Sequence, residues 1–185
     1  LNMVWDHRPG KHPFYGIAMQ EYDPLTGTLT GESKIIFKGS SLGLTEGPHI
    51  YKRNGFYYLL TAEGGTEYDH AVSLARSRHI FGPYEIHPNN PILTSSGNPE
   101  LKLQKAGHAS LVETPQGEWY MPHLCGRPLP DSKNCNLGRE TAIQKVEWYE
   151  DNWLYLAGGE NQPKMEVPAP DLDPHPWTAL ADRLP

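Results

Sequence analysis

Short stretches in which apolar and polar residues alternate, separated by glycine, proline and asparagine, make up most of the chain. Residues 16–22 and 71–76 alternate in this way, which is typical of half-buried β-strands. The strongest local signal lies at 49–61, where apolar and aromatic residues flank Asn54 and Gly55. Both of these residues tolerate the positive φ angles of a tight turn. The segment therefore predicts a β-hairpin with strands over 49–52 and 56–61.

The same pattern predicts a chain of short strands with little or no helix. Two segments rich in Pro, Asn, Ser and Gly, 87–106 and 127–138, are expected to be long loops. Further strands are expected over 1–5, 34–37, 108–113, 119–124, 140–148 and 153–157, and a turn followed by a strand is expected over 81–86.

An internal repeat organises these elements. The hairpin that starts at Glu46 is followed by a second strand pair over 71–86, and the hairpin that starts at Gly107 is followed by a second pair over 141–156. Residues 16–37 match the second half of such a unit. Repeated four-stranded units are typical of β-propeller blades. The fold class is therefore predicted as all-β, an incomplete propeller with about two full blades and part of a third.

The end of the chain differs from the rest. From residue 162 onward it holds six prolines and shows no apolar periodicity. We therefore expect residues 1–160 to form the partial propeller and residues 161–185 to be a proline-rich linker.

Charge and apolar content limit the classes of molecule that this chain is expected to bind. The formal net charge is −6 and no basic stripe runs along the chain, which argues against a nucleic-acid partner. No apolar stretch reaches membrane-spanning length, so no membrane partner is expected. A neutral substrate such as a sugar suits this charge. The chain opens with neither an initiator Met nor a signal peptide. Its localisation is left open, with the cytoplasm preferred.

Two cysteines, Cys125 and Cys135, lie ten residues apart around the second long loop. Their spacing is compatible with a disulfide and equally with two free thiols in a reducing compartment. They do not form a metal-ligand pattern.

Four side chains are placed where the starts of several strands would meet. Glu46 and His108 lie at the start of the first strand of successive units, Arg139 precedes the third strand of the last unit, and Trp5 ends the first strand. Each also has an ordinary explanation: a solvated carboxylate, a buried histidine, a surface ion pair and a core aromatic. Together they suit a sugar, because a glycosidic bond is cleaved by a carboxylic acid and an arginine fork can hold two hydroxyl groups.

The motifs themselves resemble a known family. Residues 45–49 (TEGPH) and 57–65 (YYLLTAEGG) are similar to the general-acid segment of glycoside hydrolase family 43, in the branch of β-xylosidases and α-L-arabinofuranosidases. The resemblance covers residues 1 to about 160 without interruption. It is also carried by residues 5–8 (WDHR), 12–16 (HPFYG), 105–110 (KAGHAS) and 137–144 (LGRETAIQ).

The resemblance implies a five-bladed propeller and a role for each candidate. Glu46 matches the general acid, His108 a channel histidine, Arg139 an arginine that binds sugar hydroxyls, and Trp5 an aromatic wall. Thr66 is a weaker candidate at the rim of the site. The family implies no required cofactor and no metal ligand among these residues, although some relatives place a calcium ion near the channel histidine.

The implied activity is an exo-acting hydrolase that removes xylose from β-1,4-linked xylo-oligosaccharides by inversion, with arabinofuranose as an open alternative. The aspartate base and a second aspartate that tunes the acid match positions upstream of Leu1, so the chain alone is expected to be inactive. A C-terminal β-sandwich common in the branch is absent. Assembly of the complete protein into homo-oligomers is left open. The alternatives are a non-catalytic carbohydrate-binding propeller and a protein-interaction propeller.

Overall fold

The computed structural model describes residues 1–5, 8–9, 14–130 and 132–174. Every regular element among these residues is a β-strand, so the prediction of an all-β fold is confirmed. The described part of the chain holds no helix that could cross a membrane. The strands are β1 (Asn2–Trp5), β2 (Phe14–Asp23), β3 (Thr28–Phe37), β4 (Glu46–Arg53), β5 (Phe56–Glu63), β6 (Ala71–Ser77), β7 (Glu85–Ile86), β8 (Leu93–Thr94), β9 (Gln104–Ala109), β10 (Val112–Glu113), β11 (Trp119–Gly126), β12 (Glu140–Trp148) and β13 (Leu154–Leu156).

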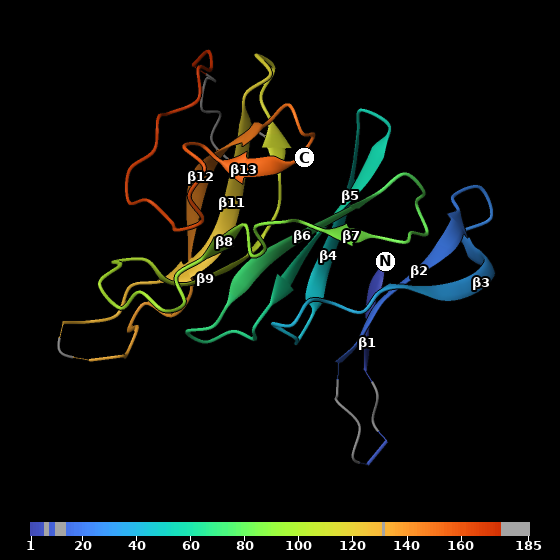
Figure 1. The fold of residues 1–185 in the computed structure, drawn as a ribbon, viewed down its shortest axis with the longest axis horizontal. Coiled ribbons are helices and arrows are strands. Elements are labelled where there is room, and N and C mark those ends of the chain that lie inside the picture. The colour runs from blue at the N-terminus through green and yellow to red at the C-terminus, as the bar shows by residue number, and fades with distance from the viewer. Residues whose placement is uncertain (6–7, 10–13, 131, 175–185) are drawn as a thin grey trace, which may run out of the picture.

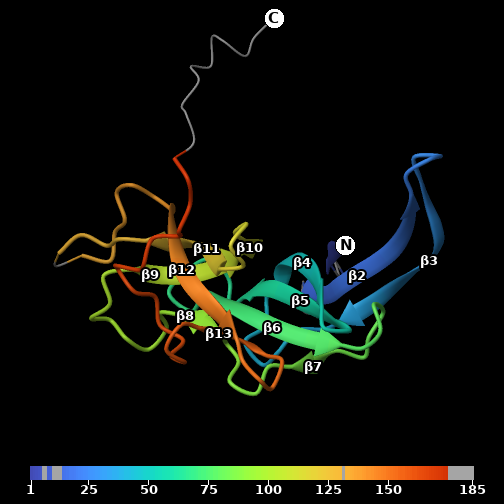
Figure 2. The ribbon, with the colours of Figure 1, turned by 90° about the horizontal axis from the view of Figure 1, so that it is seen from above.

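The strands form three antiparallel sheets that follow one another in chain order (Figure 1). The first contains β1, β2 and β3. The second runs β4-β5-β6-β7, with β8 also pairing with β6, and the third runs β10-β11-β12-β13, with β9 also pairing with β11. Figure 2 shows the outer parts of β2 and β3 extending away from the other two sheets.

The predicted hairpin at Asn54 and Gly55 is confirmed. Both turn residues have positive φ, 48° and 74°, and Arg53 pairs with Phe56 across the turn. The two strands are longer than the pattern predicted, because pairing continues to Glu46 and Ala62 at their other ends.

One strand prediction is wrong. The expected strand 108–113 is divided between β9, which already begins at Gln104, and the short β10. The division follows from the backbone, since Lys105 and His108 both have left-handed φ and the pairing of β9 with β11 shifts register. The turn and strand expected over 81–86 are confirmed, since a turn ends at residue 81 and β7 lies at 85–86.

The core explains why β5 reads as a nearly continuous apolar run. Successive side chains of a strand point to opposite faces, and both faces of β5 are covered. Tyr58 and Leu60 pack in a cluster with residues of the third sheet, whereas Leu59 packs in a cluster with Ile17 and Phe37 of the first sheet. The second sheet is thereby buried on both sides.

The second and third sheets are joined at the end where their hairpin turns lie, which we call the hairpin end. The Tyr58 hydroxyl donates to the carbonyl of Asn152 at 2.6 Å, and Arg76 Nη1 donates to the carbonyl of Asp151 at 2.7 Å. The guanidinium of Arg76 also lies over the rings of Phe56, at 4.8 Å, and Trp153, at 3.9 Å. Such stacking stabilises a charge that remains partly solvated.

Candidate active site

The opposite end of the two large sheets carries the longer connections, and we call it the loop end (Figure 1). Strand β4 begins there and β5 ends there, so Glu46 pairs with Ala62. The register shifts between Glu46 and His49, and Gly47 has a φ of 55°. This bulge turns the start of β4 away from the regular ladder, a device that re-aims a side chain. Glu46 is half-buried as a result of its place there.

The ring of His108 lies directly against Gly47. A Cβ added at Gly47 would meet His108 Nε2 at 2.7 Å and Cε1 at 2.9 Å, so only glycine leaves room for the ring. His108 itself has a φ of 47°, which is uncommon for a residue other than glycine. The structure therefore brings Glu46 and His108 together from different sheets, through the contact of the ring with the residue that follows Glu46.

A second histidine supports this arrangement from behind. His70 is fully buried, its ring packs against Gly107, and its Nδ1 lies 3.1 Å from the carbonyl of Lys105. Because a carbonyl only accepts, Nδ1 carries the hydrogen, and no described residue partners Nε2. Burial lowers the pKa of His70 to about 4, and the nearby charges of His108 and Arg139 act in the same direction.

A buried carboxyl group holds the loop that leads into β4. Glu63 is fully buried and accepts hydrogen bonds from Ser40 N at 2.7 Å, Ser40 Oγ at 2.5 Å and Thr45 Oγ1 at 2.6 Å, and from Ser73 Oγ. Gly39 allows the close approach, since a Cβ there would lie 2.6 Å from Glu63 Oε1. Glu63 thus fixes Thr45, the residue before Glu46.

Arg139 and Thr66 line a neighbouring cavity of about 350 Å³ between the β5–β6 loop and the loop before β12. Both side chains are exposed. The adjacent Glu140 is held by Arg127, whose Nε lies 3.1 and 3.0 Å from its two carboxyl oxygens, and no described residue pairs with Arg139. Arg139 is therefore available to a ligand. Of the two surface partners that the sequence offers to Arg139, Glu140 does not pair with it, and Asp131 lies outside the described residues.

Burial affects the pKa of two histidines near the site. His108 lines a shallow cavity with His49 and His123. Burial lowers the pKa of His49, with the charge of His108 adding to it, and burial also lowers the pKa of His123. In the described ranges no three His, Cys, Asp or Glu side chains are grouped as a metal site requires.

The predicted site residues thus fall into two adjacent groups. The ring of His108 lies against Gly47, the residue after Glu46, whereas Arg139 and Thr66 line a separate cavity, and the charges of both His108 and Arg139 act on the buried His70. The backbone of Trp5 pairs with Phe14, but its side chain lies outside what the structure describes.

Sequence reasoning missed Glu63 and His70. Glu63 ends an apolar run and precedes two glycines, and His70 precedes the alternating segment 71–76; neither place points to a role in the site.

The two cysteines are free thiols, which decides the alternative that their spacing left open. Cys135 Sγ lies 2.9 Å from the position of a Cβ at Gly126, and Cys125 points to the other face of β11. Burial raises the pKa of the Cys125 thiol.

The family model "Glycosyl hydrolases family 43" matches residues 1–154. The chain belongs to this family. Family 43 membership agrees with the resemblance that the motifs carry.

Individual proteins of known name are also similar to this chain. The chain is 57% identical to "Xylosidase/arabinosidase 43B" of Humicola insolens over 86% of this chain and 30% of that protein. It is 53% identical to "Beta-xylosidase" of Bacillus subtilis (strain 168) over 93% of this chain and 33% of that protein. The crystal structure of xylan beta-1,4-xylosidase from Bacillus halodurans C-125 has 61% identity and a TM-score of 0.92, over 96% of this chain and 34% of that chain.

The chain thus spans 30–35% of the length of three curated relatives that it matches. About two thirds of the length of these relatives therefore has no counterpart in this chain.

Proposed function

We propose that the complete gene product is an exo-acting glycoside hydrolase that removes terminal xylose from β-1,4-linked xylo-oligosaccharides, and arabinofuranose from suitable substrates. The observation that carries the proposal is the half-buried Glu46 at the bulged start of β4, with the ring of His108 seated on Gly47. The names of the relatives support xylose and arabinose as the sugars.

In this proposal each residue has a defined task. Glu46 donates a proton to the leaving glycosidic oxygen as the bond from that oxygen to the anomeric carbon breaks. A water molecule attacks the anomeric carbon from the opposite face and gives its proton to a carboxylate base, which inverts the configuration. Arg139 holds hydroxyl groups of the terminal sugar, with His108, Thr66 and Trp5 around it. No aspartate of this chain is assigned as the base, so the chain alone is expected to be inactive.

The proposal for the architecture follows from the same repeat. The second and third sheets are two blades of a five-bladed propeller, the first sheet is part of a third blade, and residues 1–160 are the catalytic portion. Residues 161–185 connect it to a C-terminal β-sandwich. The beginning of this connection is held against the third sheet, since Gln144 Nε2 donates to the carbonyl of Lys164 and Lys164 N donates to Gln144 Oε1, both at 3.0 Å.

The proposed reaction needs no cofactor. Calcium prefers oxygen ligands, whereas the cavity beside His108 presents imidazoles from His49 and His123. These residues do not fit such an ion, so no step is routed through calcium. The substrate is a neutral sugar, and assembly into homo-oligomers stays a prediction.

Replacing the proposed acid in the complete gene product tests the function. Glu46→Gln keeps the shape but has no proton to donate. Hydrolysis of xylobiose, which has a poor leaving group, should fall by about 10²–10⁴-fold. Hydrolysis of a nitrophenyl xyloside should fall much less, because its leaving group needs little protonation. Steady-state kinetics on both substrates give the comparison.

Glu113→Gln is the matched control, because Glu113 is an exposed strand glutamate in β10. It should leave both substrates unaffected. Equal loss on both substrates in Glu46→Gln would contradict the role of Glu46 as the acid. A complete gene product that binds xylobiose but cleaves neither substrate would favour the non-catalytic carbohydrate-binding alternative.

A further inference from the structure

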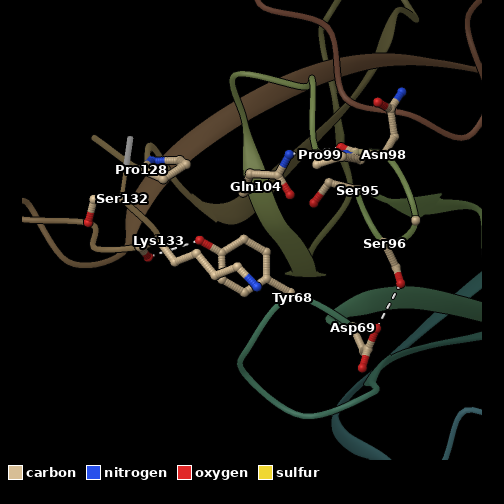
Figure 3. A pocket seen from close by; sticks show the side chains of 11 residues that line it. Tyr68, Asp69, Ser95, Ser96, Asn98, Pro99, Gln104, Pro128, Ser132 and Lys133 are labelled. Atoms are coloured by element: carbon tan, nitrogen blue, oxygen red, sulfur yellow. Dashed lines mark hydrogen bonds between the residues drawn. The ribbon is translucent and has the colours of Figure 1, made fainter. Parts of the chain in front are cut away.

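A second pocket lies beside the Arg139 cavity and is not used by the proposed reaction (Figure 3). It has a volume of about 300 Å³ and is formed by the β5–β6 loop, the segment from β8 to β9 and the loop before β12. Lys133 lines both this pocket and the Arg139 cavity, so the two are neighbours on either side of that residue.

The floor of the pocket consists of two buried polar side chains. Gln104 is 2% exposed and Ser95 is 1% exposed. The Gln104 amide nitrogen donates to the carbonyls of Asn98 at 2.9 Å and Leu101 at 2.8 Å, which leaves its carboxamide oxygen facing the pocket (Figure 3). No described residue donates to that oxygen. Ser95 Oγ accepts the N–H of Ala106 at 3.1 Å, and its hydroxyl hydrogen has no described acceptor. One fixed acceptor and one fixed donor therefore lie side by side.

The walls are apolar and held in place. Tyr68, Pro99 and Pro128 supply rings around the polar floor. The Tyr68 hydroxyl donates to the carbonyl of Lys133 at 2.9 Å, which ties the β5–β6 loop to the loop before β12 (Figure 3). A wall fixed before binding loses little conformational freedom when a ligand enters.

The rim balances its charges. Asp69 Oδ1 accepts a hydrogen bond from Ser96 Oγ at 2.8 Å, and the Lys133 ammonium lies 5.7 Å from the centre of the Tyr68 ring. One carboxylate and one ammonium give no net preference for a charged ligand. A neutral ligand with apolar faces and polar edges suits these walls and this floor.

We propose that this pocket binds one pyranose ring of a xylo-oligosaccharide whose terminal sugar occupies the site at Glu46 and Arg139. A ring fits the size, because about 300 Å³ is at the lower limit of small-molecule sites and would not hold a longer segment. The Gln104 oxygen and the Ser95 hydroxyl would bind neighbouring hydroxyl groups, and Tyr68 would pack against the C–H face. This inference rests on the proposed function, from which the ligand, a xylo-oligosaccharide, is taken.

Binding to the complete gene product tests the pocket separately from catalysis. The background is Glu46→Gln, and calorimetric titrations use xylose, xylobiose and xylotriose. Ser95→Ala should weaken the binding of the oligosaccharide that reaches the pocket by about 2- to 12-fold, the effect of one hydrogen bond, and should leave the affinity for xylose unchanged. Ser77→Ala is the matched control. Like Ser95, Ser77 is buried and its Oγ accepts a backbone N–H, at 3.0 Å. Ser77 ends β6 at the hairpin end, away from the pocket. Equal affinities in Ser95→Ala and Ser77→Ala for all three ligands would overturn the inference.

A second variant covers the case in which Ser95→Ala does not fold. Tyr68→Ala removes the wall and should weaken oligosaccharide binding more than Ser95→Ala does. Tyr22→Ala, at an exposed tyrosine of β2, is its control. A pocket variant could instead lower the number of xylose molecules bound per protein by one and leave the affinity for oligosaccharides unchanged. The pocket would then bind a free sugar, and the inference would be wrong. Failure of hydrolysis in the unchanged protein would refute the proposed function alone, since these titrations do not depend on turnover.

Discussion

Strands β4 and β9 place the same backbone feature at the loop end but use it in opposite ways. In β4 the left-handed residue is Gly47 and the residue before it is Glu46, whereas in β9 the left-handed residue is His108 and the residue before it is Gly107. Each strand thus carries one glycine and one candidate site residue in these two places, in reversed order.

The reversal is what lets the two sheets fit together. Gly47 receives the ring of His108, and Gly107 receives the ring of His70. A larger residue at either glycine would fill the space that a histidine occupies. The repeated units therefore differ as a matched pair, and a substitution in one unit disturbs packing in the other.

The largest effect is expected from Gly47→Ala in the complete gene product. The new Cβ would lie 2.7 Å from His108 Nε2 and the residue would keep an unfavourable φ. Displacement of Glu46 or His108 by about 1 Å should lower kcat/KM on xylobiose by about 10²-fold. Gly31→Ala is the control, because Gly31 also has a positive φ, 67°, but nothing lies within 4 Å of its added Cβ. Similar losses in both variants would show that the contact with His108 is unimportant.

Gly107→Ala should act on stability. Its Cβ would lie 2.4 Å from His70 Cδ2, and this ring is buried and fixed to Lys105. Overpacking of this kind should reduce the free energy of unfolding by about 1–3 kcal/mol, measured by urea denaturation of the chain. Addition of His70→Ala removes the overlapping ring, so the double variant should cost less than the sum of the two single changes. Strict additivity would contradict the packing of His70 on Gly107.

The smallest effect concerns pH. The folded-state pKa of His70 is about 4, below the ordinary value of 6.5, so the unfolded chain binds the proton first as the pH falls. The stability linked to His70 is therefore complete above about pH 6.5 and is lost as the pH falls toward 4. Between about pH 7.5 and about pH 5.5 this should amount to about 1–2 kcal/mol.

His70→Asn should flatten that dependence only in part. The pKa of the buried His87 is also lowered to about 4, mainly by desolvation, and continues to contribute. His79→Asn changes an exposed histidine and is the control. Urea denaturation at several pH values measures the slope. An unchanged slope in His70→Asn would show that His70 is not held neutral in the folded state.

The local parts of this fold could be predicted from the sequence. Asn54 and Gly55 fix a hairpin through their own backbone preferences, and β12 covers the predicted range 140–148. The beginning of β9 could not be predicted, because Gln104 lies in a polar segment and pairs with Gly126, which is distant along the chain.

The same limit applies to the candidate site. The motifs around Glu46 and Arg139 can be recognised in the sequence, because the residues of each motif follow one another along the chain. The support behind them is not, because the donors to Glu63 come from Ser40, Thr45 and Ser73, and His70 finds its place only against Gly107. Contacts between separate segments leave no periodic pattern.

The joint at the hairpin end, where Arg76 lies between Phe56 and Trp153 and donates to Asp151, connects the second and third sheets far from the loop end. Part of the stability of this pair of sheets therefore does not depend on the loops around Lys133 and Tyr68. If the proposed function holds, substitutions in these loops would alter which sugars are accepted, whereas the packed glycines and histidines of the loop end would not tolerate single changes. Laboratory evolution of substrate range would therefore best begin in these loops and leave the glycine and histidine contacts unchanged.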